Sequence, residues 1–218
     1  MKKFMLGKKA GMTQIFDSEG SAVPVTVIEC GPVTVLQNKT EEIDGYRSVK
    51  VGFQEKKQNR TNKPDKGQFE KAGVDPKKTL REFKVSEDQS FELGQVINCA
   101  DMFEVGERVD VSGVSKGKGF QGNVKRHNQK GGREAHGSKY HRRVGSLGSS
   151  ATPGRTMPGT KLPGQMGNKN VTVQNLEIVM VDGERNIMAI KGALPGSNGS
   201  VIEVREAVSH KSSRTNAR

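Results

Sequence analysis

Apolar and polar residues alternate, as they do in half-buried β-strands, in two separate parts of the 218-residue chain. Between these parts, from about residue 114 to residue 170, the alternation stops and glycine, proline and basic residues take over. The alternating segments are 22–29, 32–37, 46–53, 95–99, 108–114, 171–182, 185–192 and 200–206. The pattern therefore predicts a mainly β protein with one long insertion of different character.

The number and spacing of these segments favour one particular β architecture. Seven or more short strands predict a closed or nearly closed β-barrel, because closure leaves no unpaired strand edge. The Asp182-Gly183 pair, followed by Glu184, is a hairpin signal between two of the strands. Helix is scarce, and the best candidates are 64–72 (ended by Gly73), a turn near 76–81 and a short piece around 120–126.

The strands on either side of the insertion predict a discontinuous domain. The simplest topology is one barrel built from residues 1–113 and 171–208, with a long irregular basic extension, 114–170, inserted between strands. Residues 209–218 have no pattern, and we expect them to form a flexible C-terminal tail.

The charge of the chain is concentrated in the insertion. The whole sequence has a net charge of +12, yet residues 1–110 contain 18 Lys and Arg against 18 Asp and Glu. Residues 111–170 contain 12 basic residues, a single acid, Glu134, and 13 of the 27 glycines. Such a segment indicates a polyanionic partner.

Energetics point the same way. Fixing the backbone costs roughly 1–2 kcal/mol per residue, so ordering about 50 residues costs on the order of 50–100 kcal/mol. The insertion has few large apolar side chains, and each contributes only roughly 1.5–3 kcal/mol when fully buried. We therefore expect the free segment to be mobile and phosphates to supply the missing free energy.

Three interpretations of the insertion are open. A permanently disordered linker is the plainest, but Pro-Gly pairs at 153–154, 158–159 and 163–164 place turns at defined positions. A DNA-binding architectural protein using the same arm is the main alternative, although no recognition helix is evident. A glycine-punctuated arm suits the crevices of folded RNA best, with phosphate contacts dominating and His or Tyr side chains able to stack on unpaired bases.

The sequence gives little support to enzymatic or cofactor chemistry. The stretch 117–122, GKGFQG, matches a dinucleotide fingerprint, but no periodic helix or acidic ribose ligand follows, so we predict no nucleotide cofactor. His127, His136 and His141 lack nearby thiolate or carboxylate partners, and we predict no metal site. We find no catalytic residues and expect no small-molecule substrate.

Two further features bear on location. Cys30 and Cys99 each lie in an apolar run, which favours two buried thiols in a reducing compartment over a disulfide. No apolar run approaches the roughly 20 residues of a membrane span, and the basic start is too short in its apolar part for a secretion signal. We therefore expect a cytoplasmic protein without a membrane partner.

Six stretches, read in order, carry a family resemblance over almost the whole chain. They are KKAGMTQIF, KGKGFQGNVKRH, AHGSKYHR, TPGR, PGQMGN and VTVQNLEIV. Together they closely resemble the bacterial ribosomal protein L three family of the large subunit. The resemblance implies a structural protein of the cytoplasmic ribosome that binds large-subunit (23S) rRNA near its 3′ end and helps to organise assembly. It also implies that neighbouring ribosomal proteins touch the globular domain.

The resemblance further implies that the insertion reaches toward the peptidyl-transferase centre with a tip formed by Ser149, Ser150, Ala151, Thr152, Pro153, Gly154 and Arg155. Many bacterial relatives have a methylated glutamine immediately before Thr-Pro-Gly-Arg, where this chain has Ala151. An amide methylation is therefore impossible here. The residues expected to bind RNA are Lys116, Lys118, Lys125, Arg126, His127, Lys130, Arg133, His136, Lys139, His141, Arg142, Arg143, Arg155, Lys161 and Lys169.

Overall fold

The computed structural model describes residues 2–86 and 89–208, so the tail predicted for 209–218 lies outside the described residues. The chain forms two compact units. Unit 1 comprises Met1–Val114 with Asn170–Arg218, and unit 2 comprises Ser115–Lys169. Each unit is described by itself below.

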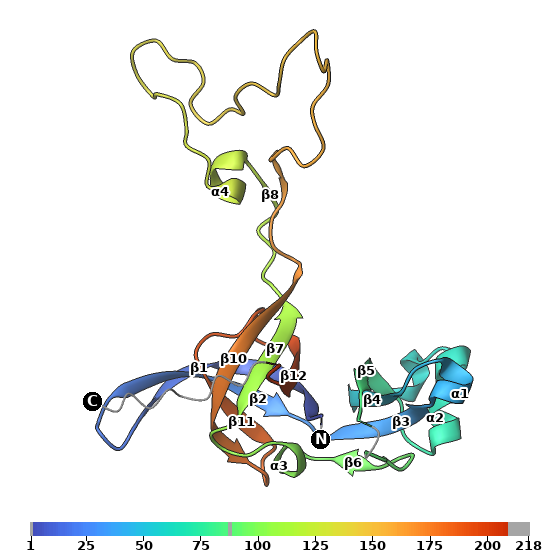
Figure 1. The fold of residues 1–218 in the computed structure, drawn as a ribbon. Coiled ribbons are helices and arrows are strands. Elements are labelled where there is room, and N and C mark those ends of the chain that lie inside the picture. Colours follow the sequence, from blue (N-terminus) through green and yellow to red (C-terminus); the bar gives the residue numbers. More distant parts are fainter. Residues whose placement is uncertain (1, 87–88, 209–218) are drawn as a thin grey trace. The chain divides into compact units, whose positions relative to one another are not determined.

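Unit 1 contains a closed barrel of six strands in the order β1-β12-β7-β10-β11-β2, which confirms the predicted fold class (Figure 1). Every neighbouring pair is antiparallel. The strands are β1 (Phe4–Phe16), β2 (Ala22–Cys30), β7 (Arg108–Val114), β10 (Asn170–Asp182), β11 (Ile187–Lys191) and β12 (Val201–Glu206). Asp182 pairs with Ile187, so the predicted β10–β11 hairpin is confirmed.

The predicted single barrel is wrong in one respect, because four strands form a separate sheet. Its order is β5 (Lys77–Lys84), β4 (Ser48–Glu55), β3 (Val33–Lys39) and β6 (Val96–Ile97). The segments predicted at 32–37, 46–53 and 95–99 therefore belong to this sheet, which also takes up the segment predicted as a turn near 76–81. Alternation identifies a strand but not the sheet to which it pairs.

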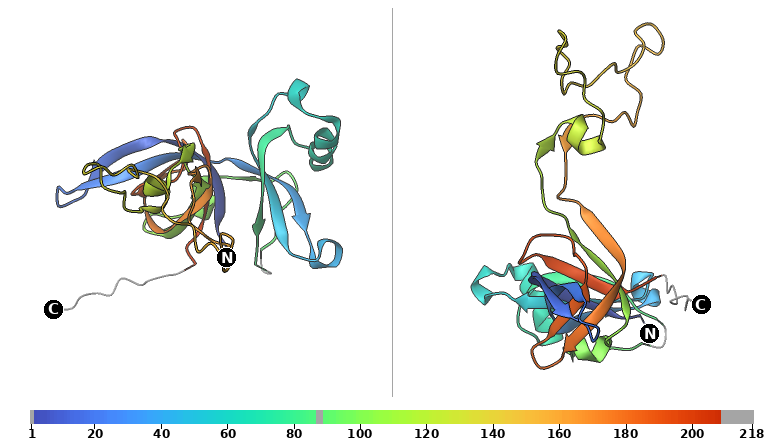
Figure 2. Two further views of the ribbon diagram at one scale, coloured as in Figure 1. Left: turned by 90° about the horizontal axis from the view of Figure 1, so that it is seen from above. Right: turned by 90° about the vertical axis from the view of Figure 1, so that its left-hand side faces the viewer.

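The first strand of the barrel is absent from the predicted set for a physical reason. Phe4, Met5 and Leu6 are all buried, so this end of β1 has no exposed face and no alternation. The other end of β1 runs beyond the barrel as a hairpin paired only with β2 (Figure 2). There the strand is mostly exposed, and its apolar residues do not alternate regularly with polar ones.

Helices are few and short. The predicted helix at 64–72 is confirmed as α2 (Lys63–Ala72), which ends at Gly73 in the left-handed conformation. Among the described residues of unit 1, the others are α1 (Glu41–Asp44), the 3-10 turn η1 (Gln58–Arg60) and α3 (Cys99–Met102). In unit 2 the piece predicted at 120–126 divides into strand β8 (Phe120–Gln121) and helix α4 (Asn123–His127), and strand β9 (Gly164–Gln165) pairs with β8.

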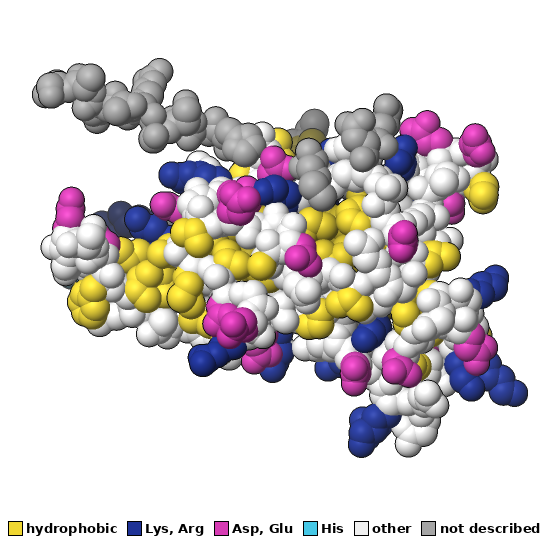
Figure 3. All heavy atoms as spheres, turned by 90° about the horizontal axis from the view of Figure 1, so that it is seen from below, with side chains coloured by type: hydrophobic (Ala, Val, Ile, Leu, Met, Phe, Trp, Pro, Cys, Tyr) yellow, Lys and Arg dark blue, Asp and Glu magenta, His cyan; other side chains and the backbone are white. Residues whose placement is uncertain are grey.

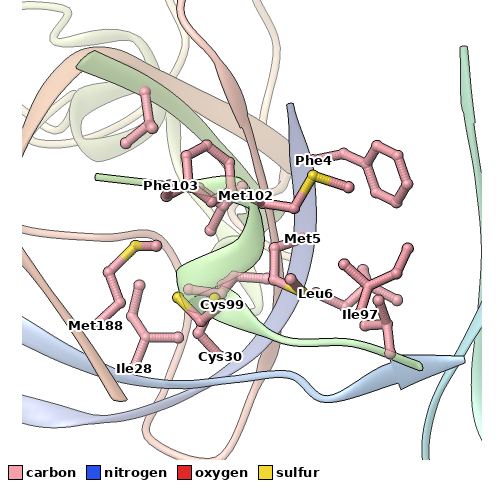
Figure 4. Close-up of a cluster of buried hydrophobic side chains, with 14 of the residues drawn as sticks. Phe4, Met5, Leu6, Ile28, Cys30, Ile97, Cys99, Met102, Phe103 and Met188 are labelled. Carbon is pink, nitrogen blue, oxygen red and sulfur yellow. The ribbon is translucent and has the colours of Figure 1, made fainter. Parts of the chain in front are cut away.

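One hydrophobic core joins the barrel and the separate sheet. Phe4 of β1 stacks on Phe83 of β5, with ring centroids 4.6 Å apart. The same cluster includes Ile28 and Met188 of the barrel (Figure 4). Ile190 of β11 also belongs to it, and none of these three residues has exposed surface. Burial of such side chains stabilises the fold by roughly 1.5–3 kcal/mol each, so the two sheets are held together by apolar contact.

The two cysteines lie next to each other in this core (Figure 4). Both are free and buried, which confirms their interpretation as small hydrophobic side chains. A hydrogen bond with Cys99 and burial together raise the pKa of the Cys30 thiol well above its ordinary value. Cys30 is therefore a neutral thiol at physiological pH and a weak nucleophile.

Candidate nucleic-acid interface

Unit 2 begins and ends as a two-stranded ribbon, defined here as residues 115–121 and 164–169. The Ser115 amide donates to the Lys169 carbonyl at 2.9 Å, and the Asn168 amide donates back to the Ser115 carbonyl at 3.2 Å. Further along, the Lys118 amide donates to the Met166 carbonyl at 2.9 Å. The pairing of β8 with β9 then completes the ribbon. The irregular part of the insertion is therefore shorter than the sequence indicated.

One glycine allows the two sides of the ribbon to approach so closely. Gly167 has a φ of +70°, a left-handed conformation that favours glycine. A Cβ atom at this position would lie 2.1 Å from the carbonyl oxygen of Lys116. Any larger residue would therefore force the ribbon apart.

Helix α4 fixes the returning chain through three side chains, which we call the α4 clamp. The Asn123 amide Nδ2 donates to the Lys161 carbonyl at 2.7 Å. Arg126 Nη1 donates to the Leu162 carbonyl at 2.6 Å, and His127 Nε2 lies 3.1 Å from the same oxygen. Because a carbonyl oxygen only accepts, Nε2 carries the proton in this contact. The clamp joins segments about 35 residues apart in the sequence.

The outer part of unit 2, residues 129–160, has no helix or strand and is held by isolated turns (Figure 1). The Gly132 amide donates to the His141 carbonyl at 2.7 Å, which closes one loop. The expected tip residues, 149–155, are all exposed and contain a turn followed by Gly154 with a φ of +63°. Ala151 lies in this turn.

The structure distinguishes two groups among the 15 residues expected to bind RNA. Arg126 and His127 are half-buried and belong to the α4 clamp. The other 13 side chains are exposed, and among the described residues none forms an ion pair. These exposed residues are Lys116, Lys118, Lys125, Lys130, Arg133, His136, Lys139, His141, Arg142, Arg143, Arg155, Lys161 and Lys169.

The charge of unit 2 has almost no internal compensation. Its 55 residues contain 12 Lys and Arg, and Glu134 is the single acid. Unit 1 differs, because cations and carboxylates lie interspersed among apolar side chains on its face in Figure 3. Uncompensated cations on an open chain attract a polyanion strongly and repel one another in its absence.

Neither a metal site nor a membrane-spanning helix is found in the described structure. Within residues 2–86 and 89–208, no three His, Cys, Asp or Glu side chains come together as metal ligands. Over the same ranges, every helix is too short or too polar to cross a bilayer.

The fold and charge define a class of protein: a β-barrel carrying a basic, largely irregular insertion. Comparison with known proteins gives the family. The family model described as Ribosomal protein L3 matches residues 78–185. The Large ribosomal subunit protein uL3 of Acetivibrio thermocellus is 54% identical over 208 residues, covering 95% of this chain and 98% of that protein. The chain belongs to the ribosomal protein L3 family. Its members are structural constituents of the large ribosomal subunit and not enzymes, and in bacteria they are part of the cytoplasmic ribosome.

Proposed function

We propose that the chain binds large-subunit (23S) rRNA directly through unit 2, near the 3′ end of that RNA, and helps to organise subunit assembly. The tip at 149–155 approaches the peptidyl-transferase centre, while unit 1 contacts neighbouring ribosomal proteins. The proposed domains are a globular barrel domain (1–113 and 171–208), an RNA-penetrating loop (114–170) and the tail (209–218). Membership of the ribosomal protein L3 family supports a place for this protein in the large ribosomal subunit.

The observation that carries this proposal is a set of 13 exposed basic side chains on a unit with one acid, none of which forms an ion pair with any residue that the structure describes. Each is available to a phosphate oxygen, and such contacts position a protein on RNA with little reading of bases. Arg126 and His127 act differently, because their hydrogen bonds to Leu162 hold the unit in shape. They support RNA binding by placing the other cations.

The geometry favours RNA over duplex DNA. Helix α4 has only five residues, too short to present a row of side chains to a major groove. A narrow ribbon and open loops are instead suited to the irregular cavities of folded RNA. An architectural DNA-binding function is the alternative that the experiment below must exclude.

The test measures the affinity of the full chain for a 23S rRNA transcript and for duplex DNA of equal length, at several salt concentrations. If about eight phosphates are contacted, RNA affinity falls about 10³–10⁵-fold between 50 and 200 mM salt. We expect the rRNA transcript to displace duplex DNA from the protein at physiological salt. A salt slope near zero, or equal affinity for DNA, contradicts the proposal.

A pair of triple variants locates the contacts. Lys118→Gln, Lys139→Gln and Lys161→Gln together remove three exposed cations of unit 2. The matched control replaces Lys57, Lys63 and Lys78, which are exposed in unit 1. The unit 2 variant should lower the salt slope by about 2, since each lost contact removes about 0.7. The control should change it much less, and equal losses would remove unit 2 as the main RNA-binding element.

A further inference from the structure

Phe120 is the most exposed aromatic residue of unit 2, with 76% of its surface accessible. It lies in β8, whereas the other exposed large apolar or aromatic side chains of unit 2, Tyr140, Leu147 and Met157, are less exposed and lie in the irregular outer part. The sequence alone predicts only that Phe120 begins a short helix around residues 120–126. An exposed aromatic ring among uncompensated cations has the composition of a nucleic-acid contact, in which bases stack on aromatic side chains beside a basic backbone-binding surface.

The ribbon holds Phe120 in a defined place. Its strand pairs with β9, where Phe120 lies opposite Gln165. The neighbouring Gly119 carbonyl accepts a hydrogen bond from the Met166 amide at 3.0 Å. The ring is therefore presented on paired backbone and not on one of the open loops.

The two nearest glycines in the chain, one before and one after Phe120, lie in open space. A Cβ atom added at Gly119 or at Gly122 would meet no other part of the protein within 4 Å. The aromatic side chain thus has no side-chain cover from its glycine neighbours. Because 76% of the surface of Phe120 is accessible, a flat partner can approach this side chain.

The charges around Phe120 indicate the chemistry of that partner. Lys116 and Lys118 precede Phe120 in the same segment of the ribbon, residues 115–121. Lys125 follows it in helix α4. All three are exposed and lack ion pairs among the described residues. A partner that offers both an apolar flat face and phosphates is an unpaired nucleotide, because aromatic side chains stack on bases while lysines contact the backbone.

We propose that Phe120 stacks on an unpaired base of rRNA and that Lys116 and Lys118 hold the adjoining phosphates. This inference rests on the proposed function. It adds a base-contacting residue to the surface of unit 2, whose exposed cations contact phosphates in that proposal. Stacking tolerates any base, so the site fixes the position of the protein without selecting a sequence.

The chain contains no tryptophan, which allows a direct spectroscopic test. Phe120→Trp introduces a single reporter, and Phe16→Trp is the matched control at an aromatic residue that is 68% exposed in β1 of unit 1. Each full-length variant is titrated with a 23S rRNA transcript. We expect strong fluorescence quenching at position 120 and little change at position 16. Equal quenching at both positions would overturn the inference.

Affinity measurements separate stacking from simple apolar contact. Phe120→Ala should weaken RNA binding about 5- to 150-fold, which is the range for losing one stacked base. Phe120→Tyr should retain the affinity, and Phe120→Leu should resemble the alanine variant because leucine has no π face. Amide exchange at Lys118 and Met166 verifies that the ribbon is intact in each variant. A leucine variant that binds as tightly as the tyrosine variant refutes stacking.

Binding of the unaltered chain is measured first, so that the two proposals fail separately. If the unaltered chain binds the transcript while the fluorescence of the Phe120→Trp variant is not quenched, stacking is wrong and the proposed function stands. If the unaltered chain does not bind, the proposed function itself is wrong.

Discussion

Arg126 Nη1 donates a hydrogen bond of 2.6 Å to the carbonyl oxygen of Leu162, 36 residues further along the chain. The sequence indicated that this guanidinium contacts phosphate, like the other cations of the insertion. In the structure, Nη1 joins helix α4 to the returning segment of unit 2, and His127 Nε2 contacts the same oxygen. The basic residues of the insertion therefore divide into one group that shapes the unit and one whose side chains are exposed.

Arg126→Lys tests this division, because it keeps the charge and removes the planar guanidinium. A hydrogen bond from a charged group contributes about 1.5–3 kcal/mol. We expect amides of α4 and of residues 161–166 to exchange at least about ten-fold faster in the free protein. Lys125→Ala, on the exposed face of the same helix, should leave exchange unchanged. Unaltered exchange in the Arg126 variant would show that the clamp contributes little.

Gly167→Ala should open the ribbon. The added Cβ would lie 2.1 Å from the Lys116 carbonyl oxygen, and the residue would have to keep a φ of +70°. We expect protection of the Lys118 and Met166 amides to be lost, measured by hydrogen exchange, with the barrel unaffected.

Gly117→Ala is the matched control for this change. Its Cβ would meet Asn168 at 3.7 Å, an ordinary van der Waals distance. The control should therefore retain ribbon protection, and equal disruption by both variants would contradict the steric argument.

Ile190→Ala should destabilise unit 1 strongly. Ile190 has no exposed surface and lies in the core that the barrel shares with the separate sheet. Deletion of such a side chain costs about 2–5 kcal/mol through lost burial and the cavity left behind. Ile43→Ala, at a residue that is 87% exposed, should change stability by less than about 0.5 kcal/mol. Denaturant unfolding followed by circular dichroism measures both.

Glu82→Gln should reduce stability in a pH-dependent way. Lys39 donates to Glu82, and this hydrogen bond lowers the pKa of the Glu82 carboxyl below its ordinary value. The carboxylate therefore stabilises the fold above the unfolded-state pKa of about 4.3, and the stabilisation disappears as the pH falls through the lower folded-state pKa.

We expect Glu82→Gln to cost up to about 1 kcal/mol at pH 7, because solvent screens the partly exposed pair. The cost should vanish in acid. Glu41→Gln, at an exposed residue, is the control in unfolding experiments from pH 7 to pH 3. A cost that is independent of pH would show that the carboxylate charge is not responsible.

The sequence by itself determined the features that depend on neighbouring residues. Alternation located β2, β7, β10, β11 and β12, Asp182-Gly183 marked a hairpin, and Gly73 marked the end of α2. The position and sign of the excess charge also followed from composition, since charge is additive along a chain. Six sequence motifs predicted the ribosomal protein L3 family, and comparison with known proteins established it.

Only the tertiary structure decided which strands pair and which side chains are free. The separation of β3, β4, β5 and β6 from the barrel depends on hydrogen bonds between distant segments, which alternation does not encode. Likewise, Arg126 and Lys125 are adjacent cations in the sequence, yet one binds Leu162 and the other faces solvent. The exposure of Phe120 was equally hidden, because burial depends on what the rest of the chain brings to a residue.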